Sequence, residues 1–172
     1  MDKKIHEQLH EQLHEQFHNA FYDTIKQSIE TEEHGYVVLL YSEIRDRLAL
    51  HVKKNGKTYQ RIHEQLDVPF FEQLLSSRQF DWNSMRGLIN TTYQWIHDLQ
   101  MPLRDTTTEE SKQRLLKSTG TMAEVVAIYI KEVHLTLDLM DRDMEDFYKN
   151  RHHPVVQNML QHAVSQCREA HK

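Results

Sequence analysis

Histidines and glutamates near the start of the chain have the spacing of a zinc-protease helix. Residues 5–18 read IHEQLHEQLHEQFH, which contains the pattern H-E-x-x-H three times, starting at His6, His10 and His14. In a zinc protease both histidines lie on one helix face and bind the metal, the glutamate acts as general base, and a further ligand comes from elsewhere in the fold. One hypothesis is therefore a metal-dependent hydrolase that uses these repeats.

Three features of this stretch favour a helix surface over a catalytic metal site. It starts at residue 5, where chain ends fray, and no predicted strand precedes it to align a peptide substrate. Its apolar residues keep the same spacing through Phe17, Phe21, Ile25 and Ile29, so helical packing accounts for the repeat. We therefore expect no cofactor and no functional metal site, and only adventitious binding of transition metals in vitro by His6, His10, His14 and His18.

The rest of the chain offers little catalytic chemistry. Its single cysteine, Cys167, lies close to the C-terminal end and is interpreted as a structural thiol. The sequence has no glycine-rich loop of the phosphate-binding type. An acidic cluster is interleaved with basic residues and is interpreted as a solvated helix face: Asp138, Asp141, Asp143, Glu145 and Asp146. We expect a protein that is not an enzyme.

The composition indicates an intracellular, helical protein. Its 172 residues are enough for one domain with a core, and they include only four glycines and three prolines. The formal charge of -5 gives no basic field for nucleic acid, and no apolar run reaches the length of a membrane span. The start MDKKIHEQ lacks the apolar segment of a signal peptide, and one cysteine fits a reducing compartment, the cytoplasm or the nucleus.

Apolar spacing and capping residues predict helices along the whole chain. No segment alternates strictly between polar and apolar residues, so no strand is expected. Asp81 is a good N-cap, Pro69 suits a first turn, and Thr107 or Thr108 is expected to cap a short helix. The expected helices cover about residues 4–33, 36–52, 58–66, 70–78, 82–100, 107–118 and 121–150, with a last one after Pro154. The predicted fold class is an all-α, single-domain multi-helix bundle.

The expected helix at about residues 121–150 has the clearest burial pattern. Its apolar residues alternate three- and four-residue steps, as in a seam that packs against other helices: Ala123, Val126, Ile130, Val133, Leu137, Met140, Met144 and Phe147. Further apolar residues lie off this seam in its first half, so the helix is apolar nearly all round there. We expect this long helix in the middle of the bundle.

The apolar residues of the opening helix recur every four residues, whereas a helix turns every 3.6. Each step drifts by about 40°, so the line of seven positions wraps through roughly 240°, too far for one flat neighbour to cover. We assign Phe17 to Ile29 to the core of a bundle domain at 17–172, and residues 1–16 to an HEQL-repeat helical extension. Leu9 and Leu13 then point away from the core, where we expect pairing with a second copy as a homodimer in preference to fraying.

Fragments of the sequence, taken in order, resemble the T-complex protein 11 family. They are FHNAFYD at 17–23, YSEIR at 41–45, LD at 66–67 with FD at 80–81, MPLRD at 101–105, and LDLMDRDMEDF at 137–147. The first resembles the family's "hxAFWD" opening, MPLRD resembles its "APVRD", and the last resembles its "LDLMKMDMANF". Together the fragments extend over about residues 17–165.

The resemblance implies an all-helical intracellular protein connected with cyclic-AMP and protein-kinase-A signalling, with no catalytic residues to transfer. The matched positions to follow, with a structural role expected first, are Arg104, Asp105, Asp138 and Asp143. The chain departs from the family pattern at Asp141, Arg142, Glu145, Asp146 and at His153-Pro154, which replaces "RP". It resembles a short version of the family's first portion, as expected of a virus or another compact genome.

The sequence therefore favours a non-enzymatic helical adaptor or regulatory protein that acts by binding a protein partner of unknown identity. Two alternatives stay open beside it. One is the metal-dependent hydrolase, and the other is a helical groove protein that binds an amphipathic peptide as apoptosis regulators do. The stretch FDWNSMRG at 80–87 faintly resembles a motif of those regulators, although its order is wrong.

Overall fold

The computed structural model describes the backbone of residues 2–170, and their side chains except at positions 156, 163 and 166–170. The elements in chain order are α1 (Asp2–Glu30), α2 (Gly35–Ala49), α3 (Lys57–Gln65), α4 (Val68–Ser76), α5 (Trp82–Leu99), the 3-10 helix η1 (Pro102–Arg104), α6 (Asp105–Leu116), α7 (Met122–Lys149) and α8 (Pro154–Ala170). No strand occurs among residues 2–170, so the predicted all-α class is confirmed. The Cys167 side chain lies outside the described part.

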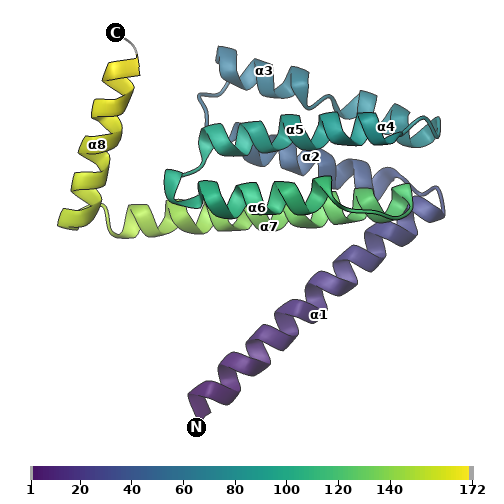
Figure 1. Cartoon of the computed structure of the whole chain (residues 1–172), viewed down its shortest axis with the longest axis horizontal. Coiled ribbons are helices and arrows are strands. Elements are labelled where there is room, and N and C mark those ends of the chain that lie inside the picture. Colours follow the sequence, from purple (N-terminus) through teal and green to yellow (C-terminus); the bar gives the residue numbers. More distant parts are fainter. Residues whose placement is uncertain (1, 171–172) are drawn as a thin grey trace. The chain divides into compact units, whose positions relative to one another are not determined.

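Contacts within the chain define two compact units, Met1–Leu137 and Asp138–Lys172, and the boundary falls inside α7. In the first unit α2 contacts α1, α3, α4 and α5, while α5 also contacts α6. Figure 1 shows α5, α6 and the first part of α7 running alongside one another in this unit. The division into an extension at 1–16 and a domain at 17–172 uses a different boundary and remains a prediction.

The first half of α7 is the most completely buried part of the chain, as its apolar pattern predicts. Val126, Ile130, Val133 and Leu137 of the expected seam are at most 1 % exposed. Residues off the seam are buried as well, namely Val125, Ala127 and Tyr129. The helix starts after Gly120, whose φ of +131° favours glycine. Thr121 then caps it, because its Oγ1 accepts a hydrogen bond of 3.2 Å from the Glu124 backbone N–H.

Caps fix the starts of α4 and α5. Helix α5 begins at the predicted residue 82, whereas α4 begins at Val68, two residues before the predicted start. The Asp67 carboxylate accepts from the Phe70 N–H at 3.1 Å, and Pro69 occupies the first turn of α4. The Asp81 carboxylate accepts from the Ser84 N–H at 2.7 Å, and this hydrogen bond lowers the pKa of Asp81. Charge-assisted caps of this kind favour the ionised carboxylate and satisfy a free helix N–H.

The predicted start of α6 is wrong. The helix begins at Asp105, directly after η1, and is not capped by Thr107 or Thr108. Thr108 is instead buried inside α6, and its hydroxyl donates a hydrogen bond to the Gln100 side-chain oxygen. A buried hydroxyl needs such a partner, because an unsatisfied polar group in the core is costly. Pro102 suits the tight turn that precedes the helix.

Helix α1 leaves the bundle earlier than the apolar spacing predicts. Ile25 is its one buried residue among those described, and Phe21 and Ile29 are half-buried. Phe17 is 67 % exposed, so assigning the core from Phe17 onward is wrong. The N-terminal half of α1 extends away from the other helices of the unit (Figure 1). All described residues up to Phe17 are exposed on every side of the helix, so the difference arises because no neighbouring helix of the unit runs alongside this half of α1.

Candidate protein-binding surfaces

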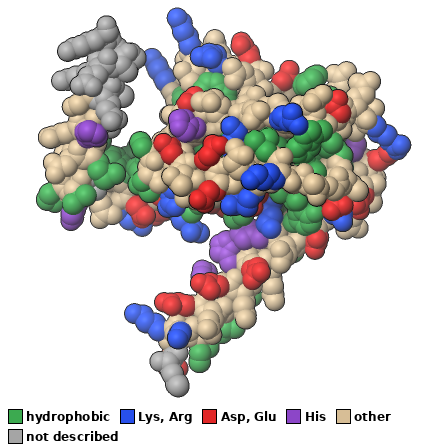
Figure 2. Space-filling view, in the orientation of Figure 1, with side chains coloured by type: hydrophobic (Ala, Val, Ile, Leu, Met, Phe, Trp, Pro, Cys, Tyr) green, Lys and Arg blue, Asp and Glu red, His purple; other side chains and the backbone are tan. Residues whose placement is uncertain are grey.

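An apolar stripe runs along the free half of α1. It consists of Ile5, Leu9, Leu13 and Phe17, whose side chains are between 51 and 67 % exposed. Every other described residue up to Phe17 is exposed too, so no part of the first unit covers this stretch. In Figure 2 histidine and acidic side chains occupy the side of this helix that is in view. Leu9 and Leu13 therefore lie where the sequence predicts them, on an open helix surface.

The histidines beside this stripe stand close to one another. The ring centroids of His10 and His14 are 6.2 Å apart, and those of His14 and His18 are 4.4 Å apart. These distances follow from the i,i+4 spacing, which brings side chains to one helix face. Among the described residues no group of three or more histidine, cysteine or acidic side chains is placed to hold a metal ion. A helix without a third ligand or an enclosing cleft does not support the hydrolase hypothesis.

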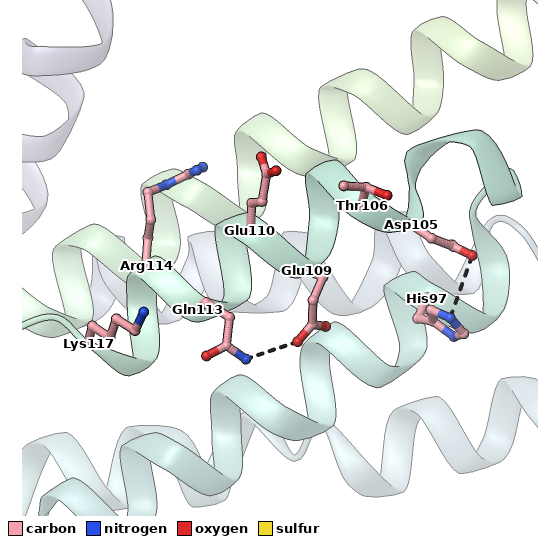
Figure 3. Close-up of a pocket in the computed structure, with 8 residues that line it drawn as sticks. All are labelled: His97, Asp105, Thr106, Glu109, Glu110, Gln113, Arg114 and Lys117. Carbon is pink, nitrogen blue, oxygen red and sulfur yellow. Dashed lines mark hydrogen bonds and ion pairs between the residues drawn. The ribbon is translucent and has the colours of Figure 1, made fainter.

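A polar groove of about 730 Å³ follows α6 on the side of α5. Figure 3 shows His97 of α5 beside residues of α6, and the groove is lined by His97, Asp105, Thr106, Glu109, Glu110, Gln113, Arg114 and Lys117. The His97 Nε2 lies 3.8 Å from the Asp105 carboxylate. The Gln113 amide donates to the Glu109 carboxylate at 2.9 Å. These side chains are solvent-exposed and carry mixed charge, so the groove is a candidate polar contact surface and not an enclosed catalytic site.

Buried hydrogen bonds hold the wall of this groove in place. The Tyr93 hydroxyl of α5 lies 2.7 Å from the Ser111 hydroxyl of α6, and Ser111 donates to the Glu132 carboxylate of α7 at 3.0 Å. Since Ser111 has one proton to give, Tyr93 donates to Ser111. Arg114 adds an ion pair with Glu132 at 3.3 Å. Burial raises the pKa of Tyr93 to about 12.

A second groove lies between α4 and α5 and is more apolar. Its volume is about 260 Å³, and its walls include Phe70, Phe71, Leu74, Phe80 and Leu88. Phe71 is buried against Tyr41 with ring centroids 4.1 Å apart, whereas Phe70 is exposed at the rim. Gly87 lines the groove without any atom near the position of a Cβ. Apolar walls with an exposed phenylalanine are typical of surfaces that accept apolar side chains of an amphipathic helix.

The family-signature residues occupy different places in the fold. Arg104 ends η1 and is half-buried, and Asp105 begins α6, where its carboxylate accepts from the Gln100 amide at 2.8 Å. Asp105 also lines the polar groove. Asp138 and Asp143 lie on α7 in the second unit, where Asp138 is exposed and Asp143 is only 9 % exposed.

Sequence reasoning missed the residues that join α5, α6 and α7. Gln100, Ser111 and Glu132 each bridge two elements through their side chains. A signal for Glu132 was present, because it is a carboxylate inside the most apolar part of the long helix. Gln100, just after the end of α5, and Ser111, in the middle of α6, carry no such signal, since a single polar residue in a polar stretch is usually solvated.

Comparison with known proteins identifies one family. The family model described as T-complex protein 11 matches residues 1–150. The match starts at residue 1 and thus includes the free half of α1, whereas the fragments recognised in the sequence begin at Phe17 and extend to about residue 165. No curated protein and no solved structure matches the chain. None of the helices among the described residues is long and apolar enough to cross a membrane.

Proposed function

Because the chain belongs to the T-complex protein 11 family, we propose that it is a non-enzymatic helical adaptor or regulator that acts by binding another protein. The family is not a known enzyme family, which supports a binding role. The observation that carries the proposal is the apolar stripe of α1, which is open to solvent within the region matched by the family. Exposed apolar side chains on a regular helix are typical of surfaces that a partner covers.

Leu9 and Leu13 are the centre of the proposed binding surface. They lie between Ile5 and Phe17 and form one line along α1. A partner helix laid against this line would cover all four side chains. The partner is either a different protein or a second copy of this chain, so the proposal includes a homodimer formed through α1.

We propose that the protein acts in cyclic-AMP and protein-kinase-A signalling, in the cytoplasm or the nucleus, and membership of the family supports this proposal. Its acidic balance, with a formal charge of -5, supports a protein partner more than a nucleic acid. Binding of the purified chain to the regulatory and catalytic subunits of protein kinase A, measured one at a time by calorimetry, tests this placement. Lack of binding to both subunits would remove the direct link.

The binding surface is tested by capture of partners from cell lysate in the presence of EDTA, which keeps metal ions out of the comparison. Leu9→Glu with Leu13→Glu should abolish capture of any protein that the unmodified chain retains, because two buried carboxylates oppose an apolar contact. The matched control is Glu11→Gln with Glu15→Gln, which changes the opposite side of the same helix. Equal capture by all three chains would place the binding surface elsewhere.

The four family-signature residues are proposed to act through structure and not as contacts to a partner. Asp105 supports this role, because its hydrogen bond with Gln100 and its position 3.8 Å from His97 connect the start of α6 to the end of α5. We propose the same for Arg104, Asp138 and Asp143. The division into a helical extension at 1–16 and a bundle domain at 17–172 likewise belongs to this proposal, with Ile5, Leu9 and Leu13 of the stripe in the extension and Phe17 at the boundary.

The groove between α4 and α5 supports a second candidate, the binding of an amphipathic peptide helix. Its exposed Phe70 and its open Gly87 are the observations in favour. Gly87→Leu would fill the groove from α5 and should block such a peptide, while leaving capture through α1 unchanged. Retention of the same partners by Gly87→Leu and by the unmodified chain would exclude the groove as their binding site.

A further inference from the structure

The HEQL repeat divides the free half of α1 into four stripes of different chemistry. Residues at equal positions in the four-residue repeat form one stripe each, and the stripes are about 90° apart around the helix. The apolar stripe is therefore flanked by a histidine stripe on one side and a glutamine stripe on the other. The glutamates form the stripe opposite, at Glu7, Glu11 and Glu15. A partner that covers the apolar stripe meets histidines and glutamines but not the acidic side.

Two copies of α1 can pair symmetrically through this stripe in two ways, and these differ in what lies beside the histidines. In a parallel pair the histidine stripe of one copy faces the glutamine stripe of the other. In an antiparallel pair a twofold axis perpendicular to the helices places histidines beside histidines. Stripes of i,i+4 type interdigitate in the commonest mode of helix packing, with helices crossing at about 50°.

The register of the antiparallel pair follows from the sequence. A twofold axis midway between Leu9 and Leu13 lies about 1.5 Å along the helix from the midpoint of His10 and His14. A helix pair related by this axis therefore buries both leucines of each copy and also brings four imidazoles together, two from each copy. The glutamate stripes of both copies face away from the contact, so like charges do not oppose the pairing.

The apolar stripe alone is small for a stable dimer. Four side chains of this exposure present on the order of 500 Å² per copy, whereas a standard interface takes about 800 Å² from each partner. A metal ion held between the copies would supply the missing stabilisation. Imidazole is a common ligand for divalent transition metals, and zinc prefers four ligands in a tetrahedron.

The histidine rings already have nearly the separation that such a metal requires. With a zinc–nitrogen distance of about 2.1 Å, two imidazoles on one tetrahedral ion have centroids roughly 5 Å apart. The pair His10–His14 at 6.2 Å and the pair His14–His18 at 4.4 Å lie on either side of this value. One chain supplies only two neighbouring ligands in this way, so the site is incomplete without a second copy.

We propose that two chains pair antiparallel through α1 and that His10 and His14 of each copy together bind one divalent transition-metal ion of the zinc type. The inference rests on the proposed role of α1 as a binding surface and adds to it the partner and the ligand. The metal is structural in this site, because four imidazoles leave no open coordination position for a substrate. Self-association of the protein is thereby made dependent on available zinc.

Zinc titration of the EDTA-treated, dialysed full chain tests the site. Light scattering should show the molar mass doubling as zinc is added, with saturation at one zinc ion per two chains and reversal by EDTA. The zinc absorption edge should show four imidazole ligands. A chain that stays monomeric at saturating zinc would overturn the proposal. A dimer that holds two zinc ions would overturn it as well, because that stoichiometry is expected of a parallel pair, in which the histidine pairs of the two copies stay apart.

Two variants separate this site from binding by the other histidines. His10→Ala with His14→Ala should lose the zinc-dependent doubling and keep the helical circular dichroism spectrum, because alanine favours helix. His152→Ala with His153→Ala removes an exposed pair outside α1 and should keep the doubling. Equal loss in both variants would overturn the proposal. The capture experiment above is made in EDTA, so its result is independent of this one.

Discussion

A single carboxylate, that of Glu132, connects α7 to α6 directly and to α5 through Ser111. It lies in the buried half of α7 with its side chain 22 % exposed, and it accepts from Ser111 and Arg114 of α6. Ser111 in turn accepts from Tyr93 of α5. A carboxylate at this depth is stabilised only when its oxygens have partners, and each of these donors comes from α6. The wall of the polar groove therefore depends on one residue of the neighbouring helix.

Glu132→Gln should weaken this connection. The amide has no charge for Arg114 and offers one acceptor oxygen in place of two, so the free energy of unfolding should fall by about 1 kcal/mol, a value reduced for solvent screening. Urea denaturation measures the change. Glu145→Gln is the matched control, because Glu145 is exposed and pairs only with Lys149 in the same helix. An unchanged urea midpoint for Glu132→Gln would mean that water satisfies Ser111 and Arg114 as well as the Glu132 carboxylate does.

The buried seam of α7 makes a second prediction at this scale. Leu137→Ala should lower the free energy of unfolding by roughly 2–4 kcal/mol, because it removes buried methyl groups and leaves a cavity. Asp146→Ala, at an exposed position of the same helix, should change it by less than about 0.5 kcal/mol. Chemical denaturation of both variants gives the comparison. Similar losses at the two positions would mean that the seam is not the packed face.

The buried tyrosines make stability depend on pH above neutrality. Burial raises the pKa of Tyr93 to about 12, and it raises the pKa values of Tyr41 and Tyr129 as well. An unfolded tyrosine ionises near pH 10, so the unfolded chain releases protons that the folded chain keeps. The stabilisation is complete below pH 10 and is lost as the pH rises from about 10 through 12.

Urea midpoints measured between pH 9 and 12 should therefore fall with rising pH. Tyr93→Phe removes one of the three groups and should make this fall shallower. Tyr148→Phe changes an exposed tyrosine and should keep the slope of the unmodified chain. Parallel slopes for all three proteins would show that Tyr93 titrates alike in the folded and unfolded chains.

At the scale of elements, local signals predict helices well and their contacts poorly. Asp81 and Pro69 mark the starts of α5 and α4 because a cap acts on its own helix. The start of α6 was mispredicted because Thr108 bonds to Gln100, a residue of another element that no local pattern reveals. Phe17 has the spacing of a core residue, but its side chain is exposed because the contact between α2 and α1 does not extend as far as Phe17. The polar groove beside α6 could not be predicted either, because it too depends on contacts between different elements.

The free half of α1 should contribute nothing to the stability of the bundle. Its side chains up to Phe17 are exposed, so their removal uncovers no core. A chain that starts at Glu15 should unfold at the same urea midpoint as the full chain, within about 0.5 kcal/mol. It should also be monomeric with and without zinc. A lower midpoint would show that the HEQL repeat packs on the bundle in solution.

At the scale of the whole molecule, a stable core and an open helix have separate tasks. The buried half of α7 and the helices around it supply the packing, while the family match extends over α1 as well as over this core. An adaptor needs both, since a rigid body must hold a contact surface that is itself uncovered. The first unit has this organisation, and its polar bonds between α5, α6 and α7 add to the packing of the core.

Thermal unfolding of the whole chain should consequently occur in two phases. An isolated helix of about 15 residues is marginal in water, so the free half of α1 should lose its helical signal gradually on warming. The bundle should follow in one cooperative transition, because its helices share a core. Circular dichroism at 222 nm measures both phases, and the spectrum should contain no sheet component.

The chain that starts at Glu15 should have a smaller gradual phase and the same cooperative transition. Zinc should remove most of the gradual phase in the full chain, since paired α1 helices no longer unfold alone. A single transition in the full chain without zinc would mean that α1 is already held by contacts that the monomer does not provide.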